Sequence, residues 1–200
     1  MATYQAVGAT CEAIMRLLQQ SWRSELFQGA DLQFKVYRTR DFATPMDAGV
    51  SLFLYRVTVN SVQRTPPARP APGGRLRRTQ LPLELHFLMT PWAKDASLDA
   101  SLEQLILGWM MRTLEDTPVL PAGILNTVIP GVFDTDETVE IVVGQLTNEE
   151  MFRIWDVLPI SYQISVPYTA RIVRIDSELD RREAGPVLTR ELDFGALKDA

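Results

Sequence analysis

Residues 63–79, QRTPPARPAPGGRLRRT, constrain the fold more than any other stretch of the sequence. They contain four prolines, two adjacent glycines and five arginines. Because proline lacks an N–H group and fixes its own φ angle, this composition allows neither a helix nor a paired strand. The flanking stretches 50–62 and 81–89 are apolar and strand-like. We therefore expect an extended hairpin with a long, mobile loop at its tip, and a loop of this length is uncommon unless it is functional or disordered.

The rest of the chain alternates helical and strand periods. Apolar residues at spacings of three and four predict helices, and strict alternation predicts strands. The expected helices cover residues 3–24, 97–116 and 147–157, with a further helical turn at 122–126; the expected strands cover 32–37, 50–62, 81–89, 138–143 and 161–175. This order favours an α+β fold in which helices cover a mainly antiparallel sheet.

Two prolines add finer expectations about the strands. Thr90, Pro91 and Trp92 are expected to form a turn that ends the strand over 81–89. Pro167 lies inside the last predicted strand, which suggests that this strand is at a sheet edge or contains a bulge.

The length of 200 residues predicts one domain, over residues 1–175, followed by a C-terminal arm over 176–200. The arm mixes acidic and basic residues around Gly185-Pro186. It also contains two apolar groups, one around Leu188 and one around Phe194, which we interpret as docking points. An ordinary terminal strand that packs on its own domain is the alternative.

Composition and cysteine content exclude several classes of protein. With 46% hydrophobic and 22% charged residues, the chain is an ordinary globular protein and not a collagen-like or wholly disordered one. Cys11 and His86 are the single cysteine and histidine, so neither an internal disulfide nor a structural zinc site is expected. The sequence lacks the pattern of a secretory signal and a run of about 18 apolar residues, so we expect a cytoplasmic chain without membrane contact.

The motifs of common enzymes are also missing. His86 lies on a predicted strand, where a structural histidine with satisfied hydrogen bonds is the favoured interpretation. Neither a G-x-S-x-G nucleophile elbow nor a phosphate-binding glycine loop is present. We therefore predict no catalytic residue, no cofactor and no metal.

Charge is distributed unevenly along the chain. The net charge of the chain is −5, but the charge differs between segments: residues from Ser61 to Leu83 carry +5, and residues from Thr113 to Phe152 carry −8. Contact between such segments on neighbouring subunits would give the head-to-tail interfaces that close into rings. The predicted protein-interaction residues are therefore five arginines, four acidic residues and the two docking points of the arm: Arg64, Arg69, Arg75, Arg77, Arg78, Asp134, Asp136, Glu137, Glu140, Leu188 and Phe194.

Each charged segment has an alternative interpretation. The four acidic residues are most simply a solvated acidic rim, since they lack the glycine and the ligand spacing of a calcium loop. The arginines could contact nucleic acid, but an acidic protein repels phosphate over the rest of its surface, and no aromatic residue lies between Arg64 and Arg78 for base stacking. Nucleic acid is therefore a disfavoured partner.

Four segments together resemble a known family. They are VSLFLYRVTVN (50–60), LPLELHFLMTPWA (81–93), LILGWMMRTLEDTPVLP (105–121) and PISYQISVPYTARIVRIDS (159–177). The sequence resembles the tail-terminator or cap proteins of phage-tail-like extracellular contractile injection systems of the antifeeding-prophage type. The resemblance covers nearly the whole chain.

This resemblance implies a structural protein without enzymatic activity. It implies an α+β fold similar to phage tail-terminator proteins, and a hexameric ring that seals the distal end of the inner tube and contacts the last sheath ring. The partners would be further copies of the chain, the inner tube protein and the sheath protein, to which the arm would add a strand or hook. Some family members have a longer C-terminal extension, so a second protein could complete the cap.

Two other functions stay open. A phage-type head-to-tail connector would use the same fold and ring to join a capsid. A nucleic-acid-binding accessory protein would use the arginine segment on phosphate, and its affinity would fall steeply with salt.

The arginine segment gives the first testable prediction. Replacing Arg75, Arg77 and Arg78 with glutamate is expected to weaken ring or particle assembly, because it reverses the charge that a neighbouring acidic surface would meet. The melting temperature of the monomeric domain should not fall, since a loop of this composition adds little to a core. Electron microscopy and thermal unfolding measure the two effects. Particles with normal caps and tube lengths would contradict the role of this segment.

Overall fold

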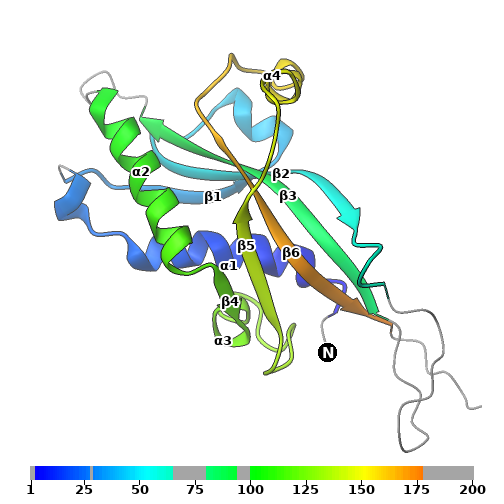
Figure 1. The fold of residues 1–200 in the computed structure, drawn as a ribbon. Coiled ribbons are helices and arrows are strands. Elements are labelled where there is room, and N and C mark those ends of the chain that lie inside the picture. The colour runs from blue at the N-terminus through cyan, green and yellow to red at the C-terminus, as the bar shows by residue number, and fades with distance from the viewer. Residues whose placement is uncertain (1–2, 28, 65–79, 94–99, 178–200) are drawn as a thin grey trace, which may run out of the picture.

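The computed structural model of the chain describes residues 3–27, 29–64, 80–93 and 100–177. Six strands form one sheet in the order β1-β2-β3-β6-β5-β4 (Figure 1). Their bounds are β1 Gln33–Tyr37, β2 Ala48–Val59, β3 Gln80–Ala93, β4 Val119–Pro121, β5 Thr138–Val143 and β6 Val166–Asp176. β1 pairs with β2 in parallel, and the other neighbours pair antiparallel. This confirms the predicted α+β fold with a mainly antiparallel sheet.

The helices are α1 Ala6–Ser21, α2 Ala100–Asp116, α3 Ala122–Leu125 and α4 Asn148–Asp156, with 3-10 turns η1 Ser24–Phe27 and η2 Thr39–Ala43. All four predicted helical segments are present. The predicted start of α4 is confirmed as a capping box, in which the Glu150 N–H donates to the Thr147 hydroxyl and the Thr147 N–H donates to the Glu150 carboxylate. The two 3-10 turns and the short strand β4 were not predicted.

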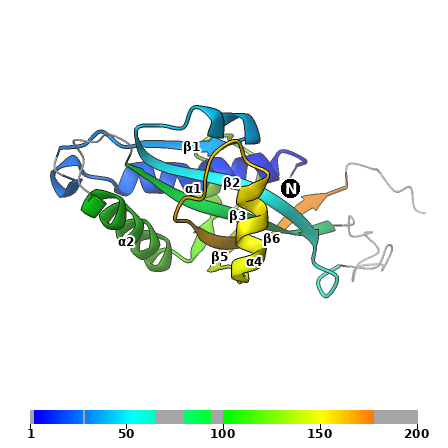
Figure 2. The same ribbon diagram turned by 90° about the horizontal axis from the view of Figure 1, so that it is seen from above.

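The sheet separates two hydrophobic clusters. The larger one lies beneath α1, α2 and α3 and includes Ile14, Leu52, Phe87 and Met110. The smaller one lies on the opposite face, near η2 and α4, and is centred on Phe42. The Phe42 ring contacts its aromatic neighbours edge-to-face or tilted, with centroids 5.2–6.2 Å apart: Tyr37, Phe53, Trp92 and Trp155. In Figure 1, α1 runs across the lower half of the molecule, where β5 and β6 cross it in the view, and α4 lies at the top; Figure 2 shows α4 crossing over β3 and β6.

β2 and β3 form the predicted hairpin pair, but β3 is longer than predicted. The turn expected at Thr90, Pro91 and Trp92 is wrong, because β3 continues to Ala93 and Trp92 pairs with Gly49. Trp92 is buried, and its indole N–H donates to the Ser51 hydroxyl at 2.8 Å. β6 pairs with β3 only as far as Met89. Pro91 lies beyond this pairing, so the N–H that proline lacks is not needed for a hydrogen bond to β6.

β6 also differs from its prediction. It begins at Val166 instead of Ser161, and it lies between β3 and β5, so the edge position suggested by Pro167 is wrong. Pro167 is accommodated near the first residue of the strand, where its carbonyl accepts from the Gly144 N–H at 2.8 Å. The irregularity in β6 is at Ile172, whose φ is 65° and which interrupts the pairing with β3 between Leu83 and Glu84. This position is unusual for a β-branched residue.

Among the described residues, no helix has the length and apolar content needed to cross a bilayer. β6 extends through Asp176, one residue beyond the predicted domain boundary. Most of the predicted arm (178–200) and most of the predicted loop (65–79) lie outside the described residues.

Gly49 allows β1 to approach β2. Its φ is 145°, and a Cβ atom at this position would overlap the backbone of Gln33 in β1. We predict that Gly49→Ala lowers the free energy of unfolding by about 2–4 kcal/mol, because the pairing of β1 must shift. Urea denaturation measures this change.

Gly108→Ala is the matched control. Gly108 is exposed in the interior of α2, and an added Cβ would meet nothing within 4 Å. This substitution should stabilise the protein by about 1 kcal/mol. Equal effects of the two substitutions would contradict the close approach of β1 to Gly49.

Candidate interaction surfaces

β2, β3 and β6 extend beyond the rest of the sheet as a three-stranded ribbon. β1 pairs with β2 only over Gly49–Phe53, so β2 has no neighbour on its outer side from Leu54 onward in the described part of the chain. On the other side, β5 pairs with β6 only as far as Arg171. The ribbon therefore has two open edges, which are the sites where another strand or subunit can pair.

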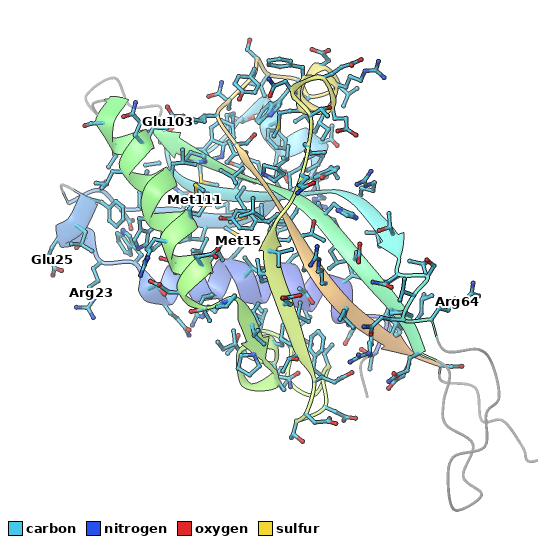
Figure 3. All side chains as sticks on the ribbon, viewed as in Figure 1. Met15, Arg23, Glu25, Arg64, Glu103 and Met111 are labelled. Carbon is cyan, nitrogen blue, oxygen red and sulfur yellow. The ribbon has the colours of Figure 1, made fainter. Side chains whose placement is uncertain are left out.

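Arg64 lies at the tip of this ribbon. After β2, the side-chain carbonyl of Asn60 accepts the N–H groups of Val62 and Gln63, at 3.1 and 3.0 Å, and this turn precedes Arg64. Arg64 is exposed, and Figure 3 places it at the opposite end of the molecule from Arg23. The other predicted arginines lie outside the described residues: Arg69, Arg75, Arg77 and Arg78.

The loop and the arm leave the domain at neighbouring positions. Gln80, the first residue of β3, pairs with Asp176, the last residue of β6. The Arg174 guanidinium also donates to the side-chain carbonyl of Gln63 at 3.4 Å. The undescribed segments 65–79 and 178–200 are therefore attached at the same end of the sheet. The predicted docking residues Leu188 and Phe194 lie outside the described residues.

The predicted acidic residues form a turn and the start of β5. Asp134, Asp136 and Glu140 are exposed, while Glu137 is partly buried. The Asp134 N–H donates to the Glu137 carboxylate at 2.6 Å, and the Glu137 N–H donates to the Asp134 carbonyl at 3.1 Å. Glu140 lies on β5 instead of in the turn, opposite Arg171 of β6.

Burial raises the pKa of Glu137, and the nearby carboxylates of Asp176 and Asp134 act in the same direction. Because Glu140 pairs with Arg171 in an antiparallel register, the turn before β5 lies towards the end of β6. No group of three or more metal-ligating side chains is present in the described ranges. The turn is thus an acidic edge without the arrangement of a metal site.

The basic tip and the acidic edge lie on opposite sides of the sheet. Arg64 follows β2, which is the outer strand of the ribbon on one side, whereas the acidic turn precedes β5, on the other side of β6. Both lie towards the same end of β3 and β6. One subunit therefore carries the exposed Arg64 on one flank, called the basic margin here, and the exposed Asp134, Asp136 and Glu140 on the other, called the acidic margin.

An apolar patch formed by α4 and the segment after it was not predicted from the sequence. Phe152, Val157 and Tyr162 are 52%, 75% and 49% exposed, and the rings of Phe152 and Tyr162 are in edge contact at 5.4 Å. On the opposite, inward face of α4, Trp155 is buried. Phe152 could have indicated this patch from the sequence, because it is a large apolar residue on the outward face of an amphipathic helix.

Comparison with known proteins identifies the family. Residues 9–189 match the family described as the Pvc16 N-terminal domain. The chain belongs to the Pvc16 N-terminal domain family. No curated protein sequence matches this member of the family.

Two solved structures share the fold of this Pvc16-family chain. One is the sheath/tube terminator of PVC, an extracellular contractile injection system, in its extended state; it has a TM-score of 0.61 and 17% identity over 99% of this chain. The other is the tube-terminating cap of the anti-feeding prophage, with a TM-score of 0.60 and 16% identity over 92% of this chain. The chain spans 65% and 59% of their lengths, less than two thirds of each. The expected likeness to tail terminators is confirmed at the level of the fold.

His86 and Cys11 are the single histidine and the single cysteine of this Pvc16-family chain, and each has surroundings typical of a structural residue. The His86 ring nitrogens lie 3.0 Å from the Thr58 hydroxyl and 3.2 Å from the Thr169 hydroxyl, which confirms a histidine with satisfied hydrogen bonds. Burial lowers the pKa of His86, and the nearby Arg56 acts in the same direction. Cys11 is buried, and burial raises its thiol pKa to about 12, so the thiolate nucleophile is not formed at neutral pH.

The environment of His86 predicts a pH dependence of stability. Since the folded pKa is lower than the unfolded one, the unfolded chain binds more protons below about pH 6.5. The contribution of His86 to stability is present above that pH and is lost as pH falls towards the folded pKa. The free energy of unfolding of the wild type minus that of His86→Gln should therefore decrease between pH 7.5 and 5. A constant or increasing difference would contradict this assignment.

Proposed function

We propose that this chain is a terminator subunit of a contractile injection system. It would close the end of the inner tube and contact the terminal sheath ring. The observation that carries the proposal is the likeness of fold over 99% of the chain to a sheath/tube terminator, combined with membership of the Pvc16 N-terminal domain family. This role requires protein surfaces and no catalytic centre, which agrees with the structural environments of His86 and Cys11.

The subunits would assemble into a ring, with six copies as the family resemblance implies. The opposite flanks of the sheet support a head-to-tail arrangement, because the basic margin at Arg64 of one copy would face the acidic margin at Asp134 and Asp136 of the next. Such heterologous contacts close into a ring when the rotation between copies allows it. Arg69, Arg75, Arg77 and Arg78 follow Arg64 in the sequence, and their positive charge would strengthen this contact.

The proposed assembly takes place in the cytoplasm of the producing cell, followed by incorporation into a released particle. The apolar patch at Phe152, Val157 and Tyr162 is a further candidate for contact with the tube or the sheath. It lies on the sheet face opposite α1, so it remains accessible when the two flanks are occupied by neighbouring copies.

Removal of the gene tests the proposal. Particles assembled without this chain are expected to have tubes of irregular length and to lack density at the tube end, because subunit addition no longer stops at a closed ring. Negative-stain electron microscopy measures both properties. Restoration by the wild-type chain is the positive control.

A charge-reversal variant sharpens the test. Complementation with Asp134→Lys, Asp136→Lys and Glu140→Lys together should fail, because like charges then meet between copies. The matched control reverses three exposed acidic residues elsewhere: Glu25, Asp31 and Asp47. It has the same net charge and should restore uniform tubes. Uniform, capped tubes without any copy of the chain would refute the proposed function.

A further inference from the structure

β1 is the edge strand of the sheet, and a groove runs along its outer side. β2 is its neighbour on one side, and the described residues place no strand on the other. A cavity of about 550 Å³ opens beside Phe34–Tyr37, between Glu12 of α1 and the η2 region. A second cavity of about 330 Å³ shares Glu12 and Phe34 and continues along α1 past Met15. The open backbone of β1 thus lies in a trough between a helix and a 3-10 turn.

The two walls of this trough differ in chemistry. Phe34 and Val36 are half-buried and pack with the larger hydrophobic cluster on the α1 side. Lys35 alternates with them and is exposed, so it lies on the η2 side. A strand added beside β1 would therefore place alternate side chains on an apolar wall and on the wall that contains Lys35 and Arg40.

The polar wall has a net positive charge. Lys35 and Arg40 line the cavity, and Arg38 lies beside it. The nearest carboxylate on that wall, Asp41, already accepts the Arg38 backbone N–H at 2.7 Å and lies within 3.8 Å of the Arg38 and Arg40 guanidinium nitrogens. Glu12 is the acidic residue of the opposite wall, where Arg16 is its cationic neighbour. An extended segment with acidic residues at alternate positions would complement the η2 wall.

The chain itself contains a segment with this pattern. Residues 191–197 read Glu-Leu-Asp-Phe-Gly-Ala-Leu, so Leu192, Phe194 and Ala196 share one face of an extended strand. The other face carries the acidic residues Glu191 and Asp193, followed by Gly195 and Leu197. This segment lies outside the described residues, and the apolar and acidic alternation of its first four residues, 191–194, matches the two walls of the β1 trough.

We propose that residues 191–197 of one copy add as a strand to the outer edge of β1 in a neighbouring copy. Main-chain hydrogen bonds to the open edge would supply affinity, and the alternating side chains would supply specificity, as in other cases of strand addition. The assignment differs from the sheath contact expected from the sequence. It does not depend on the proposed closure of a tube.

The geometry of the sheet favours a neighbouring copy over the same chain. Lys35 pairs with Ser51 and Ser51 with Thr90, so β1 lies ten residues along β3 from Gln80, the partner of Asp176. With about 3.3 Å per residue and three strand spacings of about 4.8 Å, the end of β6 lies about 36 Å from β1. Residues 177–190 would have a relaxed span of only about 20 Å. The fifteen residue steps from Asp176 to Glu191 span about 50 Å when fully extended, so the segment would have to stay stretched well beyond its relaxed span to reach its own β1.

Site-specific cross-linking of the full chain tests the proposal. One chain carries Lys35→Cys, the other carries Asp193→Cys, and a short bismaleimide tolerates a small shift of register. The native Cys11 is buried and does not react. Mixing the two chains should give a covalent dimer at least about fivefold faster than mixing Asp193→Cys with Arg153→Cys, a position that is also exposed but lies on α4.

A second substitution tests the mode of binding. Adding Phe194→Asp to the Asp193→Cys chain should reduce cross-linking about tenfold or more, because the apolar anchor is lost. Phe194→Leu should preserve most of it, and neither should change the melting temperature of the domain. Dimer formation no faster than with the Arg153→Cys control would overturn the proposal. So would a cross-link formed only within one chain when both cysteines are present in it.

Discussion

The backbone pairing of β3 with β2 and β6 is the interaction on which the rest of the structure depends. β3 pairs along almost its whole length, and its two faces contribute to different hydrophobic clusters, with Phe87 in the larger one and Trp92 in the smaller one. The helices α1 and α2 bury one face of this three-stranded centre, while η2 and α4 cover part of the other (Figure 2). Because both layers pack on the same strands, a change of register in β3 would expose both clusters at once.

The same pairing determines where the candidate interaction surfaces lie. Since β2, β3 and β6 extend past their outer neighbours, the loop and the arm both start from the end defined by Gln80 and Asp176. The order of strands then separates the basic tip at Arg64 from the acidic turn at Asp134. A ring built from such subunits would have a defined direction of assembly, because each flank complements the opposite flank and repels its own kind.

The sequence predicted those helices, strands and caps that depend on residues close together in the chain. The stripe of α1, the alternation of β5 and the capping box at Thr147 were all readable, because each is set by residues close in sequence. The length of β3 and the pairing of β1 depend on contacts between residues far apart in the sequence. Pro91 ended a predicted strand, yet the absence of β6 beside it lets β3 continue, and the parallel pairing of β1 depends on Gly49, which no local period indicates.

The candidate interaction sites were also predicted only in part. The charged segments were visible from composition alone, but their positions on opposite flanks follow from strand order, which sequence periods do not encode. The most direct measurement is a cryo-EM map of the end of an intact particle. We expect a ring of this fold at the tube end, in which the β2 flank of each copy faces the β5 flank of the next. A tube end without this fold, or a ring in which like flanks meet, would contradict it.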